Sequence, residues 1–153
     1  ASELLTTPLS AHRILLVENE RCLHQLPQPL PDTIAVLGAG LNLGWLSALW
    51  LQARDVAYWG DLDTWGLHML GMARSHRPQL HALLMDRATF DAHQDRAVPE
   101  PAHAPPPLPG SSLLLTERGL DGHLRTLENG RLEQEFLPAD VVHRAVQSWA
   151  SKA

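Results

Sequence analysis

Two aspartates separated by one residue, Asp61 and Asp63, follow a short apolar segment that predicts a β-strand. Side chains at positions i and i+2 of an extended chain point the same way, so both carboxylates can face one cation. Mg²⁺ prefers oxygen ligands and commonly takes one or two carboxylates together with water and phosphate oxygens. The alternative is structural, because aspartate is a favoured N-cap residue and a predicted helix begins near Thr64. The spacing alone leaves both a metal site and a helix cap open.

A third carboxylate, Glu18, follows the apolar segment 12–17, which predicts a buried strand. In a doubly wound sheet, ligands bind at the carboxyl ends of the strands, where loops and helix N-termini converge. Glu18 and the two aspartates would share that edge, which favours a metal site over simple capping. On its own, Glu18 could instead be a partly exposed carboxylate that pairs with Arg21. Glu20, two residues further on, is a secondary candidate at the same strand end.

A glycine motif supports a rival hypothesis. Gly38 and Gly40 follow the predicted strand 33–37 and precede a predicted helix, as in the units that bind a dinucleotide pyrophosphate. That fingerprint needs a third glycine three residues after the second, and here Gly44 comes one residue late. The acid that such sites use for the ribose hydroxyls is present as Asp61. A tight strand-to-helix turn is the simpler interpretation, and a nucleotide-cofactor-binding Rossmann domain is the alternative.

The remaining polar residues give weaker signals. The segment Arg131-Leu-Glu-Gln-Glu135 is an acidic cluster that, taken alone, indicates a solvated face or a helix start. The nine histidines lie scattered, without the spacing of a zinc site. Cys22 is the only cysteine, so an internal disulfide is excluded and we expect an inert thiol.

Alternating strands and helices must position the carboxylates. Strands are predicted at 12–17, 33–37, 55–59 and 80–85, with helices at 41–53, 64–76 and 86–94. Strands separated by helices of this size indicate an α/β fold with a mostly parallel sheet and helices on both of its faces. This pattern ends at residue 94, so we expect an α/β core over residues 1–94.

The rest of the chain has a different character. Half of the twelve prolines lie between residues 95 and 110, which predicts an exposed connector over 95–110. Residues 111–153 are predicted to form a helical C-terminal extension that packs on the core. Within it, Gly119 and Gly122 suggest two short helices, followed by a final helix with one apolar face.

Charge and hydropathy limit the class of protein. Twelve Lys and Arg against seventeen Asp and Glu give a net charge of −5, whereas nucleic-acid binders usually carry a basic excess. The composition therefore argues against an autonomous DNA- or RNA-binding module. No apolar run approaches the ~20 residues that span a bilayer, and the N-terminus lacks the pattern of a signal peptide. We expect a cytoplasmic protein without membrane association.

With these residues in view, the chain resembles the Toprim fold, which has a Glu after its first strand and an Asp-x-Asp after its third. It is more closely similar to the C-terminal region of the nuclease subunit (JetD) of bacterial Wadjet anti-plasmid systems. The block around residues 58–66 carries the resemblance most specifically. The matching stretches are Val17-Glu-Asn-Glu20, Leu37-Gly-Ala-Gly40, Tyr58-Trp-Gly-Asp-Leu-Asp-Thr-Trp-Gly66, Leu83-Leu-Met-Asp-Arg87 and Arg131-Leu-Glu-Gln-Glu135.

The resemblance implies metal-dependent phosphodiester hydrolysis on DNA, with Mg²⁺ or Mn²⁺ as the cofactor. Glu18, Asp61 and Asp63 map onto the family's metal-binding and acid/base positions. Glu133 and Glu135 belong to the family pattern and become secondary candidates. A metal-activated water is the expected nucleophile, because the tyrosine domain of the topoisomerase-like relatives has no counterpart in this sequence.

The resemblance also implies partners. Members of the family carry further N-terminal domains for DNA contacts, so this sequence is expected to be a fragment or a remnant with weak activity alone. DNA would reach the site through domains or subunits absent from the chain, and SMC-like defence-complex subunits are the expected protein partners, with a homodimer left open. A third hypothesis is a catalytically silent Toprim scaffold that serves assembly.

Overall fold

A four-stranded parallel sheet forms the centre of the molecule in the computed structural model, which describes residues 2–38, 43–101, 105 and 112–152. The strands lie in the order β2-β1-β3-β4, and every neighbouring pair is parallel. This architecture confirms the predicted α/β fold. The strands are β1 (Arg13–Val17), β2 (Thr33–Leu37), β3 (Asp55–Trp59) and β4 (His81–Ala82).

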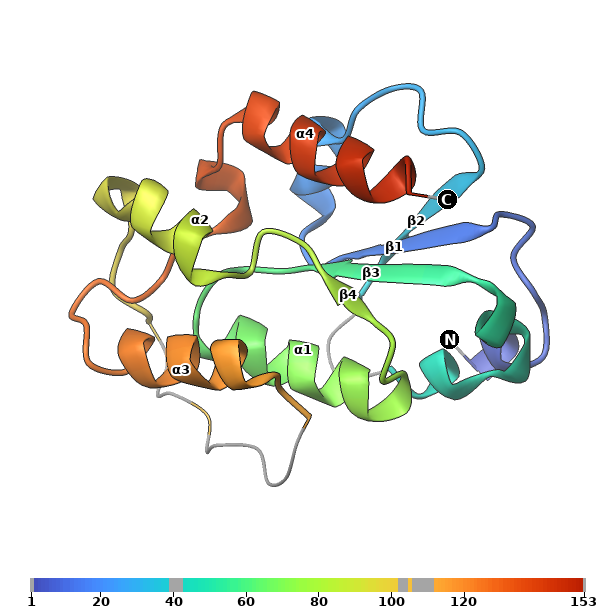
Figure 1. The fold of residues 1–153 in the computed structure, drawn as a ribbon, viewed down its shortest axis with the longest axis horizontal. Helices are drawn as coiled ribbons and strands as arrows, with labels where there is room; N and C mark the ends of the chain where they lie inside the picture. The colour runs from blue at the N-terminus through green and yellow to red at the C-terminus, as the bar shows by residue number, and fades with distance from the viewer. Residues whose placement is uncertain (1, 39–42, 102–104, 106–111, 153) are drawn as a thin grey trace.

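Helices cover both faces of the sheet, as expected. In Figure 1, α4 (red) lies on one side of the strands, and α1 (green) and α3 (orange) lie on the other. None of the helices in the described part of the chain is long and apolar enough to cross a membrane. The α-helices are α1 (Thr64–His76), α2 (Arg87–Ala92), α3 (Leu115–Leu124) and α4 (Ala139–Ala150). Short 3₁₀ helices span Ser2–Leu5, Glu20–Gln25, Gly44–Ser47, Leu49–Ala53, Gln94–Arg96 and Gln134–Phe136.

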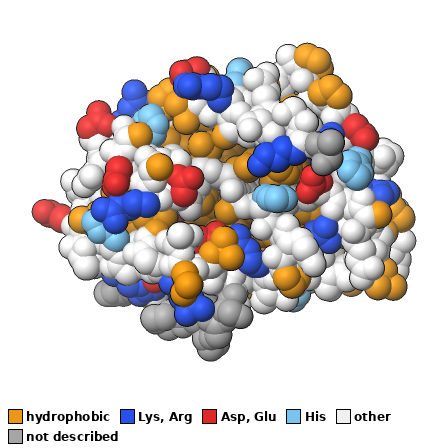
Figure 2. Space-filling model, in the orientation of Figure 1, with side chains coloured by type: hydrophobic (Ala, Val, Ile, Leu, Met, Phe, Trp, Pro, Cys, Tyr) orange, Lys and Arg blue, Asp and Glu red, His pale blue; other side chains and the backbone are white. Residues whose placement is uncertain are grey.

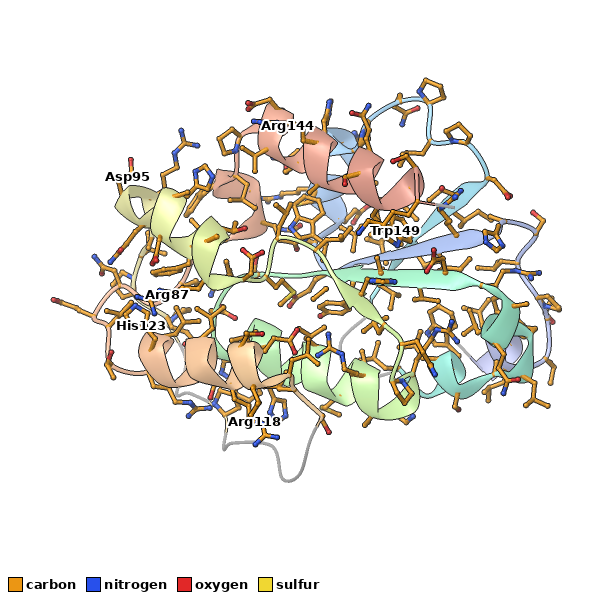
Figure 3. All side chains as sticks on the ribbon, viewed as in Figure 1. Arg87, Asp95, Arg118, His123, Arg144 and Trp149 are labelled. Atoms are coloured by element: carbon orange, nitrogen blue, oxygen red, sulfur yellow. The ribbon has the colours of Figure 1, made fainter. Side chains whose placement is uncertain are left out.

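The core lies between the sheet and these two helical layers. The last four residues of both β1 and β3 are buried, because each of these strands has neighbours on both sides and helices above and below. On α4, Val142, Val146 and Trp149 recur at helical spacing and are buried. Figure 3 shows Trp149 between α4 and the sheet and Arg144 on the outer side of the helix. The predicted apolar face of the last helix is therefore confirmed.

The predicted helix over residues 41–53 was wrong. Residues 39–42 lie outside the described part of the chain, and beyond them two 3₁₀ helices are separated by Ala48, whose backbone (φ −59°, ψ 140°) is not helical. The buried residues Trp45, Ala48 and Leu51 recur every third residue. A spacing of three matches the 3.0 residues per turn of a 3₁₀ helix, so this burial pattern favours 3₁₀ turns over a regular α-helix.

Two further predictions need correction. The predicted strand 80–85 pairs with β3 only over His81–Ala82, and Leu84 then takes a left-handed conformation (φ 60°) that ends the strand. The predicted break at Gly119 and Gly122 does not occur, because α3 runs through both glycines. Each glycine weakens a helix by only about 1 kcal/mol, and the packing of the buried apolar face of α3 outweighs this.

Candidate functional site

The carboxyl ends of β1 and β3 form the floor of the candidate site. The two strands are neighbours in register, with Val17 opposite Trp59. The chain leaves them towards opposite sides of the sheet, since β2 lies beyond β1 and β4 beyond β3. Such a switch point leaves a crevice where ligands bind in open α/β sheets. Glu18 and Asp61 lie at this point, as predicted, and the Asp61 amide donates to Glu18 Oε2 at 3.1 Å.

Gly60 permits this close approach of the two strand ends. A Cβ at this position would lie 2.6 Å from Glu18 Oε2 and 2.9 Å from the Tyr58 ring. Any other residue would therefore push the Glu18 carboxylate or the Tyr58 ring away. The phenol of Tyr58 is fully buried, and its pKa is raised chiefly by burial and also by the charges of Glu18 and Asp61. Tyr58 is therefore held as a neutral packing residue beneath the carboxylates.

Asp63 and Asp61 have different structural roles. Asp63 is the N-cap of α1, because its Oδ1 accepts the Gly66 amide at 2.6 Å. The capping interpretation of this aspartate is therefore correct, and its side chain is only 4% exposed. Asp61 does not cap the helix. Its Oδ1 accepts the backbone amide of Gln134 at 2.9 Å, which ties the strand end to the C-terminal part of the chain.

Arg131 lies against the carboxylates of both aspartates. Its backbone exchanges two hydrogen bonds with Val98, and the next residue, Leu132, does the same with Leu62. The guanidinium then lies 3.6 Å from Asp61, 3.7 Å from Asp63 and 3.0 Å from Glu133. Arg131, which belongs to the predicted extension, thus supplies the positive charge at the site. Its backbone is held by Val98, which belongs to the predicted connector. The division into core, connector and extension stays a prediction.

Gln134 locks the two strand ends together. Its side chain is 1% exposed, donates to the Trp59 carbonyl at 3.0 Å and accepts the Asn19 amide at 3.1 Å. Because its backbone amide also binds Asp61, this one residue connects the ends of β1 and β3. The sequence places Gln134 within an acidic segment, but Gln134 was not predicted to be a site residue.

Glu100 is a site residue that sequence reasoning missed. It lies in the proline-rich segment, yet its carboxylate accepts hydrogen bonds from the Thr64 hydroxyl at 2.8 and 2.9 Å and from the Trp65 amide at 3.2 Å. These contacts place a negative charge at the N-terminus of α1, where the helix dipole favours it. The only sequence signal is the acidic side chain within an otherwise proline-rich stretch.

The carboxylates at the site are incompletely neutralised. Burial is the largest cause that raises the pKa of Asp63 to about 7, and the charges of Glu100 and Asp61 add to it. Burial and the charge of Asp61 likewise raise the pKa of Glu18. Arg131 acts in the opposite direction on both groups. The clustered carboxylates therefore favour the approach of additional positive charge.

The secondary candidates lie at the edge of this cluster. Glu133 pairs with Arg131 at 3.0 Å, and Glu135 accepts the Asn19 side-chain amide at 2.7 Å. Glu20 is exposed at the start of a 3₁₀ helix. Cys22 is buried, and burial together with nearby carboxylates raises the pKa of its thiol to about 12, as expected for an inert thiol.

The carboxylate oxygens of the site are ligands that suit a hard cation, but they are not arranged to coordinate one. Among the residues that the structure describes, no three Asp, Glu, His or Cys side chains are placed to hold one metal ion. Arg131 instead bridges Asp61 and Asp63. Metal binding by Glu18, Asp61 and Asp63 therefore stays a hypothesis, and it requires Arg131 to yield at least one of its ion pairs.

The dinucleotide alternative lacks its helix in the described residues. Gly38 follows β2 and donates its amide to the Val17 carbonyl at 2.9 Å, whereas Gly40 lies outside the described part of the chain. Over Gly44–Ser47 and Leu49–Ala53 the chain forms 3₁₀ helices, not the α-helix whose N-terminus binds a pyrophosphate. Asp61, the acid assigned to the ribose, is engaged by Gln134 and Arg131.

Replacing Gly66 tests the turn that carries both aspartates. A Cβ at Gly66 would overlap the Asp61 carbonyl oxygen, so Gly66→Ala is expected to lower the free energy of unfolding by about 2 kcal/mol. Gly119→Ala is the matched control, since a Cβ there meets nothing within 4 Å. It should stabilise α3 by roughly 0.5–1 kcal/mol. Urea denaturation measures both, and equal effects of the two substitutions would contradict the close approach at Gly66.

The raised pKa of Asp63 predicts a pH-dependent stability. In the unfolded chain Asp63 ionises near its ordinary pKa of 3.8, and in the folded chain near 7. Between these values the folded state binds the extra proton, so the free energy of unfolding falls as pH rises from about 4 to about 7. Asparagine retains the capping oxygen without the charge. Asp63→Asn should therefore be more stable than the wild type at pH 8 by roughly 4 kcal/mol.

Urea denaturation at several pH values, in the presence of a chelator, measures this difference. It should be largest at pH 8 and disappear below about pH 3, where the wild-type carboxyl is protonated in both the folded and the unfolded state. A stability difference that does not change with pH would show that the pKa of Asp63 is not raised by burial in the folded chain.

On the face shown in Figure 2, the basic and acidic side chains of the described residues are interspersed and form no basic patch. A family model described as "Wadjet protein JetD, C-terminal" matches residues 1–146. No curated protein matches the chain.

Proposed function

Because the chain belongs to the family of Wadjet protein JetD C-terminal regions, we propose that it is the catalytic part of a Toprim-like, divalent-metal-dependent DNA nuclease in plasmid defence. The observation that supports this proposal most is the position of Glu18 and Asp61 at the switch point between β1 and β3. Asp63 lies two residues further on, and Arg131 contacts both aspartates. This is the edge of the sheet where a ligand and its counter-charges would meet.

Glu18, Asp61 and Asp63 would hold Mg²⁺ or Mn²⁺, whose role is to polarise the scissile phosphate and to lower the pKa of a bound water. Other residues of the chain position these carboxylates and balance their charge. Gln134 and the Glu18–Asp61 hydrogen bond fix the strand ends. Arg131 neutralises part of the acidic charge before a cation arrives, and it keeps a positive charge next to the site afterwards.

DNA contacts are assigned to other domains or subunits. The net charge of −5 and the interspersed charges of Figure 2 give this chain little electrostatic attraction for a phosphate backbone. The proposed protein partners are SMC-like subunits of the defence complex and a second copy of the chain. A silent scaffold in the same complex is the competing hypothesis, and the nicking activity of Asp61→Asn compared with that of the wild type separates the two.

A comparison of thermal shifts tests the choice of ligand. We expect Mn²⁺ and Mg²⁺ to raise the melting temperature of the chain and NAD to leave it unchanged. The cation effect should shrink in Asp61→Asn, while Asp91→Asn on the exposed side of α2 should behave like the wild type. Stabilisation by NAD without stabilisation by either cation would instead support the dinucleotide alternative.

A further inference from the structure

Arg77, directly after α1, is a buried cation without an acidic partner. Its residue surface is 8% exposed, and its Nη2 donates to the Arg54 carbonyl. Its Nε is buried without a hydrogen-bond partner. No carboxylate among the described residues lies within ion-pair distance of it. Asp55 attracts it from further away and already contacts His81 at 3.5 Å.

The other buried arginine of the chain shows what Arg77 lacks. Arg74 is 7% exposed, and it forms a two-pronged ion pair with the equally buried Glu117. A buried charge is costly unless it is paired and hydrogen-bonded. Burial accordingly lowers the pKa of the Arg77 guanidinium. The Arg77 guanidinium is therefore buried without the counter-anion that would stabilise its charge.

A pocket of about 520 Å³ lies beside Arg77. Each of its polar side chains carries a group that can donate a hydrogen bond, and no aspartate or glutamate contributes to it. Besides Arg77, the polar residues that line it are Ser47, Gln52, His76 and Gln79. A guanidinium surrounded by amide, hydroxyl and imidazole groups is a setting that recognises oxyanions.

We propose that this pocket binds an oxyanion of the phosphate class, with Arg77 as its charged ligand and Gln52, His76 and Gln79 as neighbouring donors. The phosphate could be free or could belong to DNA, since both present the same oxygens. The pocket lies near the start of β3 and the carboxylates lie past its end, about 20 Å away at ~3.3 Å per residue. The inference therefore does not depend on the proposed nuclease activity.

Placing a carboxylate in the pocket gives the sharpest test. Gln52 is exposed, so Gln52→Glu is expected to fold, and its charge supplies the anion that Arg77 lacks. Gln147→Glu on α4 is the matched control, because Gln147 is also exposed and α4 lies on the other face of the sheet. Inorganic phosphate is titrated into each protein against chloride at equal ionic strength, with the melting temperature as the readout.

We expect phosphate to stabilise the wild type and Gln147→Glu. The affinity of Gln52→Glu for phosphate should be lower by at least about tenfold. Without phosphate, Gln52→Glu should melt at a higher temperature than Gln147→Glu. Arg77→Gln, if it folds, should lose the phosphate effect. Phosphate that stabilises Gln52→Glu as much as the wild type, or that acts no better than chloride on the wild type, would overturn the proposal.

A second arm identifies the source of the phosphate. A short DNA duplex is titrated into the wild type and the two glutamate variants. Weaker DNA binding by Gln52→Glu than by Gln147→Glu would assign the pocket to a DNA phosphate. Equal DNA binding, with the phosphate effect still lost in Gln52→Glu, would assign it to a free phosphate or nucleotide.

Discussion

Replacing Asp61 with asparagine is expected to reduce the nicking of supercoiled plasmid by about 100-fold or more. The Asp61 carboxylate would be a direct ligand of the catalytic cation, and even indirect supporting contacts in metal sites are worth 10–100-fold. Asparagine keeps the oxygen that accepts the Gln134 amide, so the strand end should hold its position. The negative charge that faces Arg131 is lost.

The experiment compares the intact protein, assembled with its Wadjet partners, with its Asp61→Asn variant in Mg²⁺ and in Mn²⁺. Asp91→Asn serves as the control, since Asp91 lies on α2 in an exposed ion pair with Arg87. Full activity in Asp61→Asn would place the chemistry elsewhere. An assembly that stays intact but lacks nicking activity even with wild-type Asp61 would favour the scaffold hypothesis.

Breaking the buried ion pair between Arg74 and Glu117 should cost about 3–5 kcal/mol in the free energy of unfolding. Both side chains are 8% exposed, and Glu117 also accepts the Leu114 amide at 2.8 Å, at the start of α3. Glu117→Gln leaves the Arg74 charge buried without a counter-charge. It also weakens the contact that joins α3 to α1.

Chemical denaturation measures this effect against Glu128→Gln, which removes the same charge at an exposed position. The control should stay within about 0.5 kcal/mol of the wild type. A double substitution, Arg74→Met with Glu117→Leu, should recover most of the lost stability, because paired apolar side chains need no counter-charge. A loss below about 1 kcal/mol in Glu117→Gln would contradict the buried environment of the pair.

Much of the framework could be predicted from local sequence. The strands 33–37 and 55–59 and the helix 64–76 have the predicted bounds, because each has a strong local start and stop. The helix begins at an aspartate cap and ends before Pro78. The rule that strand ends of a parallel sheet share one edge then correctly predicted that Glu18 and Asp61 lie close together.

The rest of the site depends on contacts that have no local periodicity. Glu100 reaches Thr64 across 36 residues, and Gln134 reaches Asp61 across 73. Single β-bridges, not regular strands, place Val98 beside Arg131, so no alternation of apolar and polar residues marks the pairing. Arg131 was therefore missed as the group that neutralises the two aspartates.

The negative charge of the chain is partly explained by this cluster. Four carboxylates, those of Glu18, Asp61, Asp63 and Glu100, gather where β3 ends and α1 begins, and Arg131 is the cation that contacts the two aspartates. The acidic composition that argues against autonomous DNA binding thus coincides with a site that attracts cations.

Calorimetric titration of Mn²⁺ into the chain measures whether Glu18, Asp61 and Asp63 bind a divalent cation. We expect saturable binding to the wild type and binding at least about tenfold weaker in Asp61→Asn. Glu20→Gln, whose side chain is exposed at the edge of the site, should bind Mn²⁺ nearly as well as the wild type. Binding of Mn²⁺ to Asp61→Asn with the affinity of the wild type, or no binding to the wild type at all, would contradict a divalent cation held by these carboxylates.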